Sequence, residues 1–578
     1  MRTRLFTILG VVLAAGFLIA YSGQSASAVK KAAADAQLAE FQWHTVVNNS
    51  FAIPDSNANF SSYSQPSINS DGMIVFRARS TGGRHVSGIF KRKANTGKIV
   101  TIADQKVDVP YPNNLGTKFR EFSAFPRIAA NADYIAFEGL HQPVYRYFLD
   151  DGEETRIGTA GIYAMLGSDL LLTGASKLAP APGFEYFGVP GFKNMPFNIF
   201  PGGSAITDDG AVVFKGNFTV DDEEQTGIFF RPLINTPGGG TDVVGVIATS
   251  MMDIPNQPPS GIYKELTFDS TAPPTVAGNR VIFLGLDNEW DPHVGGIYIA
   301  EIKDGAPFEA IVEIGSPPPG LEGTVPALTR LGEGLSFDGR YIAFWGAWGN
   351  EMRNLRLNCP ADGNPDIVAY CRGGDPRSQY DEENDIWYQM QQVPENQGIF
   401  LYDVIARQTY LVADNVNGFS DFQFWVYSGK VPGSGGGDDI DAEPPRWRSS
   451  AFAAVSETTV VFKARTAVQG KDGTYFDPKD GIYMKDPVSG IPMLIVAETG
   501  MDGALFDPAL TPGTMPVTEL GIERDGFRGR RLAINLAMGN EEAGWGGIYF
   551  TVVGGSHSAL PTKEADKSLS DRLGKKRQ

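Results

Sequence analysis

The chain has 578 residues, a formal net charge of −18 and only two cysteines. A surface this acidic repels the phosphate backbone, so we expect no nucleic-acid partner. The chain also contains 68 glycines, 38 prolines and 36 phenylalanines, a composition typical of short strands joined by many turns. Composition therefore favours an all-β protein over a helical one.

Residues 1–28 have the pattern of a secretory signal peptide. Two arginines precede an uncharged apolar run at 5–21, and Ser-Ala-Ser-Ala at 25–28 supplies a cleavage site. An uncleaved anchor is the alternative, although the run is slightly short for a membrane span. We expect cleavage, a secreted or periplasmic location and no membrane span afterwards. Residues 29–43 then form a lead-in to the first strand.

Residues 65–104 predict the repeating unit of the fold. The apolar runs and turns in this stretch predict four strands, at 65–69, 73–77, 88–92 and 99–103. The turns Asn-Ser-Asp-Gly and Asn-Thr-Gly supply the positive φ angles that tight hairpins need.

Two markers of this unit recur seven times in strict alternation. The third-strand marker is Gly-Ile followed by Phe or Tyr, at 88–90, 161–163, 227–229, 296–298, 398–400, 481–483 and 547–549. An apolar second strand precedes each copy, at 73–76, 134–137, 211–214, 280–283, 341–344, 459–462 and 531–534. Because the two markers alternate seven times in the same order, they indicate seven repeats of one structural unit.

Only six fourth strands follow these markers, at 99–104, 170–176, 243–248, 309–315, 409–414 and 494–498. The seventh lies at the other end of the chain, because residues 44–54 align with residues 100–110. An N-terminal strand that completes the last sheet closes a ring without a free edge. The sequence therefore predicts an all-β, seven-bladed β-propeller over residues 44–555, closed by an N-terminal strand in the last blade. An open solenoid of β units is the alternative, and the displaced strand argues against it.

The repeats resemble the bacterial secreted tandem-repeat proteins named for the motif NxxGxxAF. Asn69, Gly72, Val75 and Phe76 fit this motif closely, and residues 207–214 fit it loosely. The resemblance covers nearly all of the chain after the signal peptide. Because the motif is structural, the resemblance implies no activity and no catalytic residues.

Two classes of connection are long: those from second to third strands, and those from each fourth strand to the next repeat. Strand direction alternates, so both classes lie on one face of the ring, where binding is expected. The largest are two neighbouring rim insertions, 345–397 and 415–450, which could form a lid or side wall. Residues 556–578 form a polar tail that is predicted to be disordered.

Asn-Glu pairs at the exits of three second strands make Glu289, Glu351 and Glu541 candidate ligand-binding residues. Equivalent positions in different blades would place these carboxylates around one mouth, where they could bind Ca²⁺ or a cationic ligand. The alternative, which we favour, is that Asn-Glu is local turn chemistry.

Six of the eight tryptophans fall on the loop-rich face, among them the candidates Trp290, Trp345 and Trp348. Exposed tryptophans beside carboxylates are typical of sugar-binding clefts. Alternatively, Trp345 and Trp425 pack beneath the long loops as a second core. Both interpretations stay open.

Cys359 and Cys371 are an even pair twelve residues apart, which in an exported chain favours a local disulfide over free thiols. Three histidines, His85, His141 and His293, fall in second-to-third-strand loops. No metal-type spacing links these histidines, so chance placement is favoured over a metal site.

Asp362, Asn364 and Asp366 repeat the first three ligand spacings of a calcium loop. The full pattern fails, because Ile367 and Gly373 occupy the positions of its glycine and its bidentate glutamate. The three residues are weak metal candidates, and Ca²⁺ is the one cofactor that the sequence suggests.

We expect a binding or scaffold module that recognises a glycan or an extracellular protein on the loop-rich face. The alternative is an extracellular polysaccharide-degrading enzyme, a hydrolase or lyase, with Glu289 or Glu351 as acid or base. Two rim carboxylates about 5–10 Å apart in a tryptophan-lined cleft would favour the enzyme. The sequence assigns no catalytic residue.

Overall fold

The structure is a computed structural model that describes residues 37–554, except 81–85, 95, 150, 169, 235–242, 257–265, 290, 361–363, 416–418, 430, 433–443, 470–474, 491 and 540–542. The expected signal peptide, most of the lead-in and the expected polar tail lie outside the described residues. Within the described residues, no helix is long and apolar enough to cross a bilayer.

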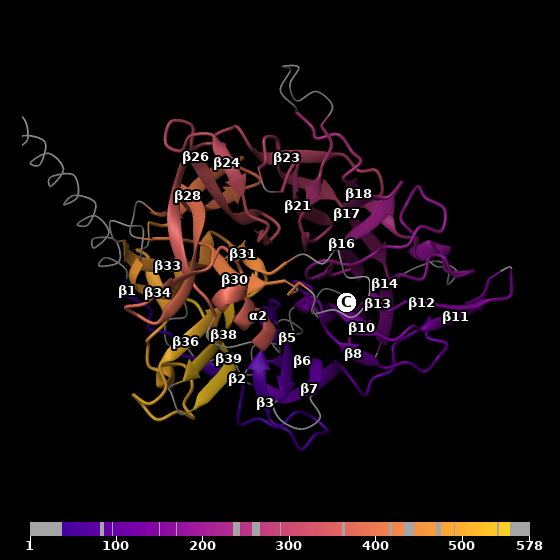
Figure 1. Cartoon of the computed structure of the whole chain (residues 1–578), viewed down its shortest axis with the longest axis horizontal. Coiled ribbons are helices and arrows are strands. Elements are labelled where there is room, and N and C mark those ends of the chain that lie inside the picture. The colour runs from indigo at the N-terminus through magenta and orange to yellow at the C-terminus, as the bar shows by residue number, and fades with distance from the viewer. Residues whose placement is uncertain are drawn as a thin grey trace, which may run out of the picture.

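Seven sheets, the blades, surround one axis (Figure 1). Blade one contains β3 (Phe60–Tyr63), β4 (Ser67–Ile68), β5 (Met73–Ser80), β6 (Ser87–Lys93) and β7 (Thr96–Asp104). Blade two contains β8 (Phe119–Glu121), β9 (Arg127–Ile128), β10 (Tyr134–His141), β13 (Ala160–Leu166) and β14 (Leu170–Ser176). Blade three contains β15 (Ala205–Ile206), β16 (Ala211–Val220), β17 (Glu223–Pro232) and β18 (Gly245–Thr249). Blade four contains β19 (Ser270–Thr271), β20 (Thr275–Ala277), β21 (Arg280–Leu286), β22 (Gly295–Glu301) and β23 (Phe308–Glu313).

Blades five to seven complete the ring. Blade five contains β24 (Leu328–Leu331), β25 (Ser336–Phe337), β26 (Tyr341–Asn358), β28 (Ile386–Asp403) and β29 (Gln408–Asp414). Blade six contains β32 (Ala453–Ser456), β33 (Thr459–Gln469), β34 (Tyr475–Lys485) and β35 (Leu494–Glu498). Blade seven contains β36 (Val517–Gly521), β37 (Phe527–Arg528), β38 (Arg531–Gly539) and β39 (Gly544–Val552). Short 3-10 turns, η1 (Glu185–Phe187) and η5 (Gly503–Leu505), lie in the connections. All seven third-strand markers fall in the third strands, so the predicted seven-bladed propeller is confirmed.

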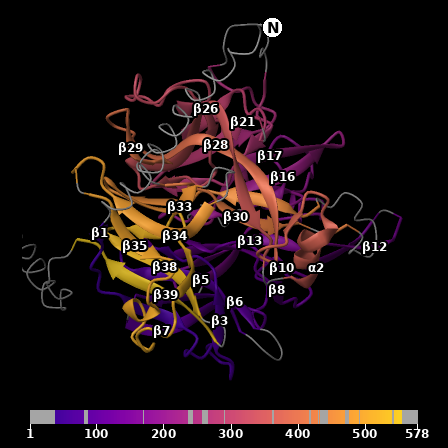
Figure 2. The ribbon, with the colours of Figure 1, turned by 60° about the vertical axis from the view of Figure 1, so that its left-hand side comes forward.

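The last blade is closed by the N-terminal strand, as the sequence predicts. β2 (His44–Asn48) pairs antiparallel with β39, and His44 lies opposite Phe550 while Asn48 lies opposite Gly547. A second N-terminal strand, β1 (Gln37–Leu38), pairs parallel with β35 at the edge of blade six (Figure 2). The sequence analysis did not predict β1, because two residues carry no periodicity.

The glycine of each third-strand marker is required by a repeated β-bulge. A Cβ on Gly88 would lie 2.8 Å from the ring of Phe90 and 2.9 Å from the carbonyl oxygen of Ala103. The pairing with the fourth strand shifts register between Ile89 and Phe90, and at the equivalent position in the other blades. The glycine therefore admits both the bulge and the aromatic ring that folds back over it.

The first strand of most blades is broken into two pieces. In blade one, β3 pairs with the far end of β5 and β4 pairs with its beginning. The sequence analysis predicted a single strand at 65–69, but Pro66 stands at the break and offers no backbone donor. The inner pieces, β4, β9, β15, β20, β25, β32 and β37, contact one another in turn, and β37 contacts β4. These contacts close the axis on the side of the short turns, which we call the trimmed face.

The hydrophobic core lies between neighbouring blades rather than in one centre. Val75 and Ile89 of blade one pack with Phe137 and Tyr163 of blade two in one buried cluster. Similar clusters fill the other interfaces between blades. Each blade is therefore stabilised by both of its neighbours, as in other repeat architectures.

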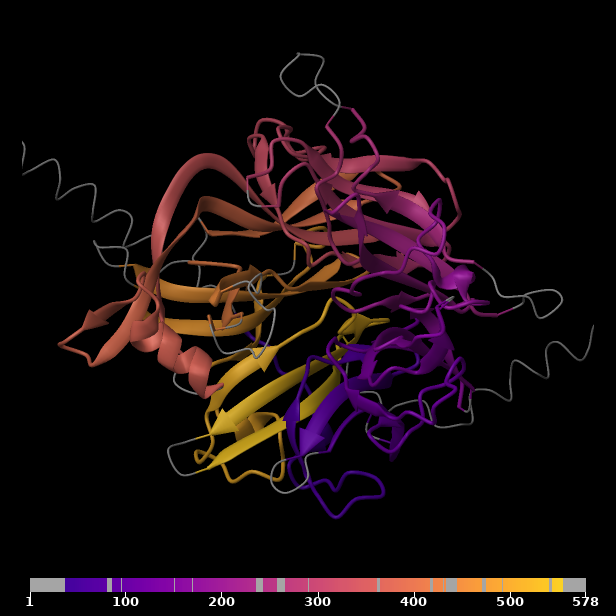
Figure 3. The same cartoon turned by 45° about the vertical axis from the view of Figure 1, so that its right-hand side comes forward.

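The loop-rich face carries a long projection from blade five, which we call the arm. β26 and β28 pair with each other as far as Asn358 and Tyr388, well beyond the blade, and a register irregularity lies between Trp348 and Met352. The end of the arm contains α2 (Pro365–Ala369), a π turn η2 (Tyr370–Gly374) and β27 (Gln379–Asp381). Figure 3 shows the arm rising from the ring, and Figure 1 shows α2 near the middle of the ring.

Two hairpins also extend from the blades. β30 (Phe424–Ser428) and β31 (Arg446–Ser450) form one within the second predicted insertion, and this hairpin lies beside the arm. β11 (Tyr145–Phe148) and β12 (Glu154–Ile157) form the other, between the second and third strands of blade two.

Candidate functional site

Two of the candidate tryptophans for a sugar-stacking surface, Trp345 and Trp348, are buried. Trp345 is 4% exposed, and its indole nitrogen donates a 3.0 Å hydrogen bond to Oε1 of Gln397. Trp348 is 9% exposed and packs edge-on to Phe400. Trp425 packs against buried leucines of the arm. The packing alternative therefore describes Trp345 and Trp425, whereas Trp290 lies outside the described residues.

Two of the three candidate carboxylates lie in the described part of the chain. Glu289 and Glu351 are both exposed, and Glu351 lies at the irregularity where the arm leaves blade five. Glu541 lies outside the described residues.

The calcium-like spacing is used in part as a helix cap. Oδ1 of Asn364 accepts a 3.0 Å hydrogen bond from the backbone nitrogen of Asp366, at the start of α2. Asp362 lies outside the described residues. Over the parts of the chain that the structure describes, no three His, Cys, Asp or Glu side chains are grouped to hold a metal ion.

The two histidines that the structure describes have different surroundings. His141 is buried, lies 2.8 Å through Nδ1 from the carbonyl oxygen of Gln142 and contacts the hydroxyl of Tyr163. Burial lowers the pKa of His141. His293 is exposed beside Asp287, and His85 lies outside the described residues.

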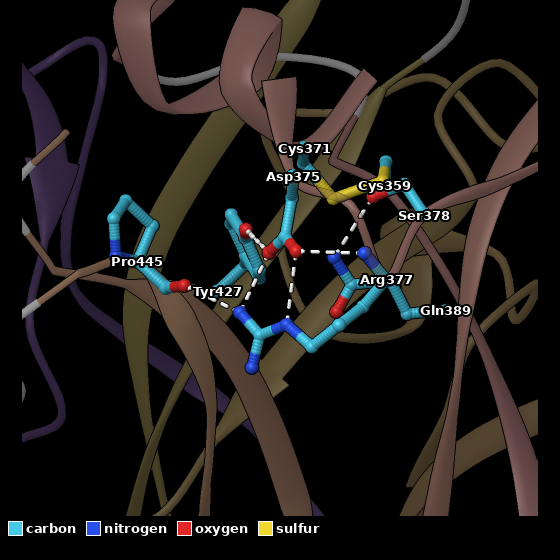
Figure 4. The surroundings of a disulfide bond; sticks show 8 residues. All are labelled: Cys359, Cys371, Asp375, Arg377, Ser378, Gln389, Tyr427 and Pro445. Carbon is cyan, nitrogen blue, oxygen red and sulfur yellow. Dashed lines mark hydrogen bonds and ion pairs between the residues drawn. A yellow bond between two sulfur atoms is a disulfide. The ribbon is translucent and has the colours of Figure 1, made fainter. Parts of the chain in front are cut away.

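The predicted disulfide between Cys359 and Cys371 is confirmed, with the two Cα atoms 5.8 Å apart. It lies beside Asp375, which accepts hydrogen bonds from Arg377 and from the hydroxyl of Tyr427 in β30 (Figure 4). Burial alone would raise the pKa of Asp375, but these hydrogen bonds hold it well below its usual range. The end of the arm is thus fixed covalently and is bound to the β30–β31 hairpin.

The hairpin is in turn bound to blade six. The ammonium group of Lys463 lies 2.9 Å from the centre of the Phe424 ring, and burial lowers the pKa of Lys463 to about 7. The indole nitrogen of Trp425 donates to Asp421, which bridges to Arg465 of β33. The arm and hairpin therefore form one wall beside the axis.

A charged tripeptide, Glu523-Arg524-Asp525, occupies the axis at the break between β36 and β37. Asp525 binds Nε of Arg127 at 2.6 Å, and both side chains are 2% exposed. Its backbone oxygen accepts from the nitrogen of Ile68 in blade one. The backbone oxygen of Arg524 accepts from Ser336 of blade five at 2.7 Å. We call residues 523–525 the axial plug.

Arg127, on β9 of blade two, connects the plug to the other side of the ring. Its guanidinium donates to the carbonyl oxygen of Pro274 at 2.6 Å and to the hydroxyl of Thr275 at 3.2 Å, both in blade four. Arg528 donates to the second oxygen of Asp525 at 2.5 Å. Burial alone would raise the pKa of Asp525, but the two arginines hold it well below its usual range.

Charged side chains from three blades act on one another electrostatically near the plug. This set, the axial cluster, consists of Lys215, Glu333, Glu523 and Arg524. Burial lowers the pKa of Lys215, and the carboxylate of Glu333 opposes this effect. Burial alone would lower the pKa of Arg524, but Glu523 and Glu333 raise it above its usual value. Glu333 is exposed, so solvent reaches the cluster, and Glu289 also acts on Lys215 electrostatically.

A buried carboxyl group lies in blade two, one residue after the central Phe137. Oε2 of Glu138 accepts a 2.5 Å hydrogen bond from the hydroxyl of Ser123. Burial raises the pKa of Glu138, with opposing contributions from Ser123 and Lys177. Lys215 follows Phe214 at the equivalent position in blade three.

The sequence analysis missed both the plug and the axial cluster. A signal was present, since the break in blade seven holds three consecutive charged residues. The other breaks are mostly Ser, Pro, Gly, Ala and Phe. A groove of about 490 Å³ on the outside of blade three, lined by Tyr186 and Phe230 among others, includes no residue of the cluster.

Comparisons with known proteins give no family. No family model matches the chain, and no curated protein matches it. Among solved structures, the β-propeller domain of the trilobed protease from Pyrococcus furiosus matches with 9% identity and a TM-score of 0.35, over 87% of this chain and all of that one. The polysaccharide lyase Uly1 matches with 9% identity and a TM-score of 0.37, over 90% of this chain and all of that one.

A third solved structure is Zg3597, a family 117 glycoside hydrolase from Zobellia galactanivorans. It matches with 11% identity and a TM-score of 0.25, over 56% of this chain and 87% of that one. Likenesses this weak assign neither an activity nor a ligand. The chain is a seven-bladed β-propeller on the order and closure of its own sheets.

Proposed function

We propose that the protein is a secreted or periplasmic binding module that recognises a glycan on its loop-rich face. The axial cluster is the observation that carries this proposal. It combines donors, from Lys215 and Arg524, with acceptors, from Glu333 and Glu523. Sugar hydroxyls both donate and accept hydrogen bonds, so a mixed set of this kind matches them.

The surrounding architecture supports the same use of this face. The axial plug closes the base of the site, and the arm with the β30–β31 hairpin provides a wall fixed by the Cys359–Cys371 disulfide. A disulfide of this kind suits an oxidising, extracytoplasmic compartment. Rigid support of a binding site limits the entropy lost when a ligand is bound.

A glycan-array screen of the purified protein, with and without chelator, tests the proposal. We expect one class of glycan to be retained by the wild type and released by Lys215→Met, which removes a donor from the axial cluster. Glu457→Gln is the control, because Glu457 is an exposed residue in the turn between β32 and β33 on the trimmed face. Absence of retention across the array would overturn the proposal.

A polysaccharide-degrading enzyme is the second candidate, and Glu138 is the observation that favours it. A buried carboxyl group with a raised pKa is suited to act as a general acid. Release of reducing ends from polysaccharide by the wild type, lost in Glu138→Gln and retained in Glu351→Gln, would support this activity. No release by the wild type would remove the enzyme from consideration.

A further inference from the structure

Five aromatic rings contact one another in a continuous row beside the outer strand of blade two. This set, the aromatic row, consists in order of contact of Tyr147, Tyr145, Phe184 and Tyr186, with Tyr111 beside Phe184. Neighbouring ring centroids in the row lie between 4.8 and 6.4 Å apart. All five residues belong to connections of the loop-rich face, between β7 and β8, between β10 and β13 and between β14 and β15.

The rings of the row are supported from the protein side and reach solvent on the other. Tyr145, Tyr147 and Tyr186 are partly buried and pack against the hydrophobic core between blades one and two. The guanidinium group of the buried Arg231 lies 5.2 Å from the centre of the Tyr186 ring, a cation–π contact that holds this ring in place. Tyr111 is 76% exposed. The row therefore presents aromatic surface that is already ordered in the free protein.

The row leads into the groove of about 490 Å³ on blade three, because Tyr186 also lines that groove. Two exposed carboxylates, Glu185 and Asp304, lie in the same lining. Oε1 of Glu185 accepts from the backbone nitrogen of Gly183 at 3.1 Å, and Oδ1 of Asp304 accepts from that of Val246 at 2.9 Å. Both carboxylates are thus positioned by backbone donors. The volume of the groove falls within the range of about 300–1,000 Å³ that is usual for ligand pockets.

Aromatic rings beside carboxylates indicate a sugar ligand. A sugar can stack its C–H face on an aromatic ring while its hydroxyls donate to carboxylate oxygens. Charge does not narrow the choice of sugar, because the exposed Lys193 and Lys303 each adjoin a residue of the groove in the sequence. A row of single rings is long and narrow, which matches an extended chain of sugars, whereas a stable protein partner would cover a broad patch of about 800 Å².

We propose that the aromatic row and the groove on blade three form one binding track for an extended polysaccharide chain. The rings of the row stack on successive parts of the chain, and the groove holds a sugar unit whose hydroxyls donate to Glu185 and Asp304. This inference rests on the proposed glycan-binding function and adds a contact surface that shares no residue with the axial cluster.

Affinity electrophoresis through gels that contain a soluble polysaccharide tests the track, with neutral glucan, xylan and galactomannan and with acidic polygalacturonate and alginate. Tyr111→Ala removes an exposed ring from the row, and Asp304→Asn removes an exposed charge from the groove. Each change should weaken binding about three- to tenfold, the effect of losing one stacked ring or one charge-assisted hydrogen bond.

Phe148→Ala is the matched control. Phe148 is an aromatic residue that is 69% exposed on the same hairpin as the row, but side chains alternate along a strand, so it lies on the opposite face of β11 from Tyr147. Its removal should leave polysaccharide binding unchanged. Circular dichroism of all three variants checks that the fold is retained.

The outcomes separate the track from the function. Binding by the wild type that Tyr111→Ala and Asp304→Asn weaken and Phe148→Ala does not supports the track. Binding that neither Tyr111→Ala nor Asp304→Asn changes, or that Phe148→Ala weakens equally, overturns the track and leaves glycan binding elsewhere on the protein. A wild-type dimer in sedimentation that Tyr111→Ala dissociates would make the row an interface between two copies and would also overturn the track. Absence of binding by the wild type to every polysaccharide overturns both the track and the proposed function.

Discussion

The ion pair at the axis offers the most direct test of how the ring is held together. Replacing Arg127 with Met keeps much of the apolar stem but removes the guanidinium group. Asp525 then retains only Arg528 as an ionic partner, and the acceptors in blade four lose their donor. The buried carboxylate of Asp525 then lacks one of the two arginines that stabilise its negative charge.

The expected cost follows from the burial of both groups, each 2% exposed. Removing one partner of a buried pair costs about 3–5 kcal/mol of the free energy of unfolding. Arg127→Met combined with Asp525→Asn should cost less than the sum of the two single changes, because the carboxylate charge is absent. The coupling between the two residues should be at least about 1 kcal/mol.

Equilibrium urea unfolding, followed by tryptophan fluorescence and circular dichroism, measures these differences. Lys118→Met is the control, because the ion pair of Lys118 with Asp108 is half exposed on both sides and contributes at most about 1 kcal/mol. If Arg127→Met were no less stable than Lys118→Met, the plug would not be holding the blades, and this account of the axis would be refuted.

Three further predictions concern other parts of the molecule. Burial raises the pKa of Glu138 above its ordinary value, so the folded state binds a proton more tightly than the unfolded state, and stability should fall as pH rises above about 4.3. Glu138→Gln should flatten this fall in urea titrations at several pH values, and an unchanged slope would exclude Glu138 as its source. Val47→Asp places a charge at a fully buried position of the closing strand and should lower the free energy of unfolding by about 3 kcal/mol or more; wild-type resistance to limited proteolysis would contradict this. Replacing Cys359 and Cys371 with Ala removes a cross-link over 12 residues, worth about 3 kcal/mol; hydrogen exchange should quicken in α2 and β27 but not in β5 or β6, and faster exchange in the blades would show that the arm supports the ring.

The ring could be predicted from the sequence because its constraints are local. A Cβ on Gly296 would lie 2.1 Å from the carbonyl oxygen of Val312, so the bulge of each blade requires a glycine in the third-strand marker. The closing strand could be recognised because it carries the same pattern as the other fourth strands. Both signals lie within ten residues or so of chain, where hydrophobic alternation and turn residues are reliable.

The site was harder to predict because its partners are distant in the sequence. Arg127 and Asp525 lie 398 residues apart, and no periodic pattern connects them. Trp345 illustrates a second difficulty, because the sequence alone cannot decide whether a tryptophan that follows a strand stacks on a ligand or packs in the core. Its environment is set by Gln397, 52 residues further along, and by packing against blade six.

The pairing of β2 with β39 affects when the protein can fold during its synthesis. Its two partners are among the first and the last parts of the domain to leave the ribosome. Until residue 552 is available, the opening segment has no sheet to join, and every shorter chain exposes an unpaired edge. Contacts between residues so far apart also slow folding. The ring of blades can therefore close only after synthesis of the domain has ended. A truncation that removes β39 would leave β2 and β38 with unpaired edges instead of giving a smaller ring.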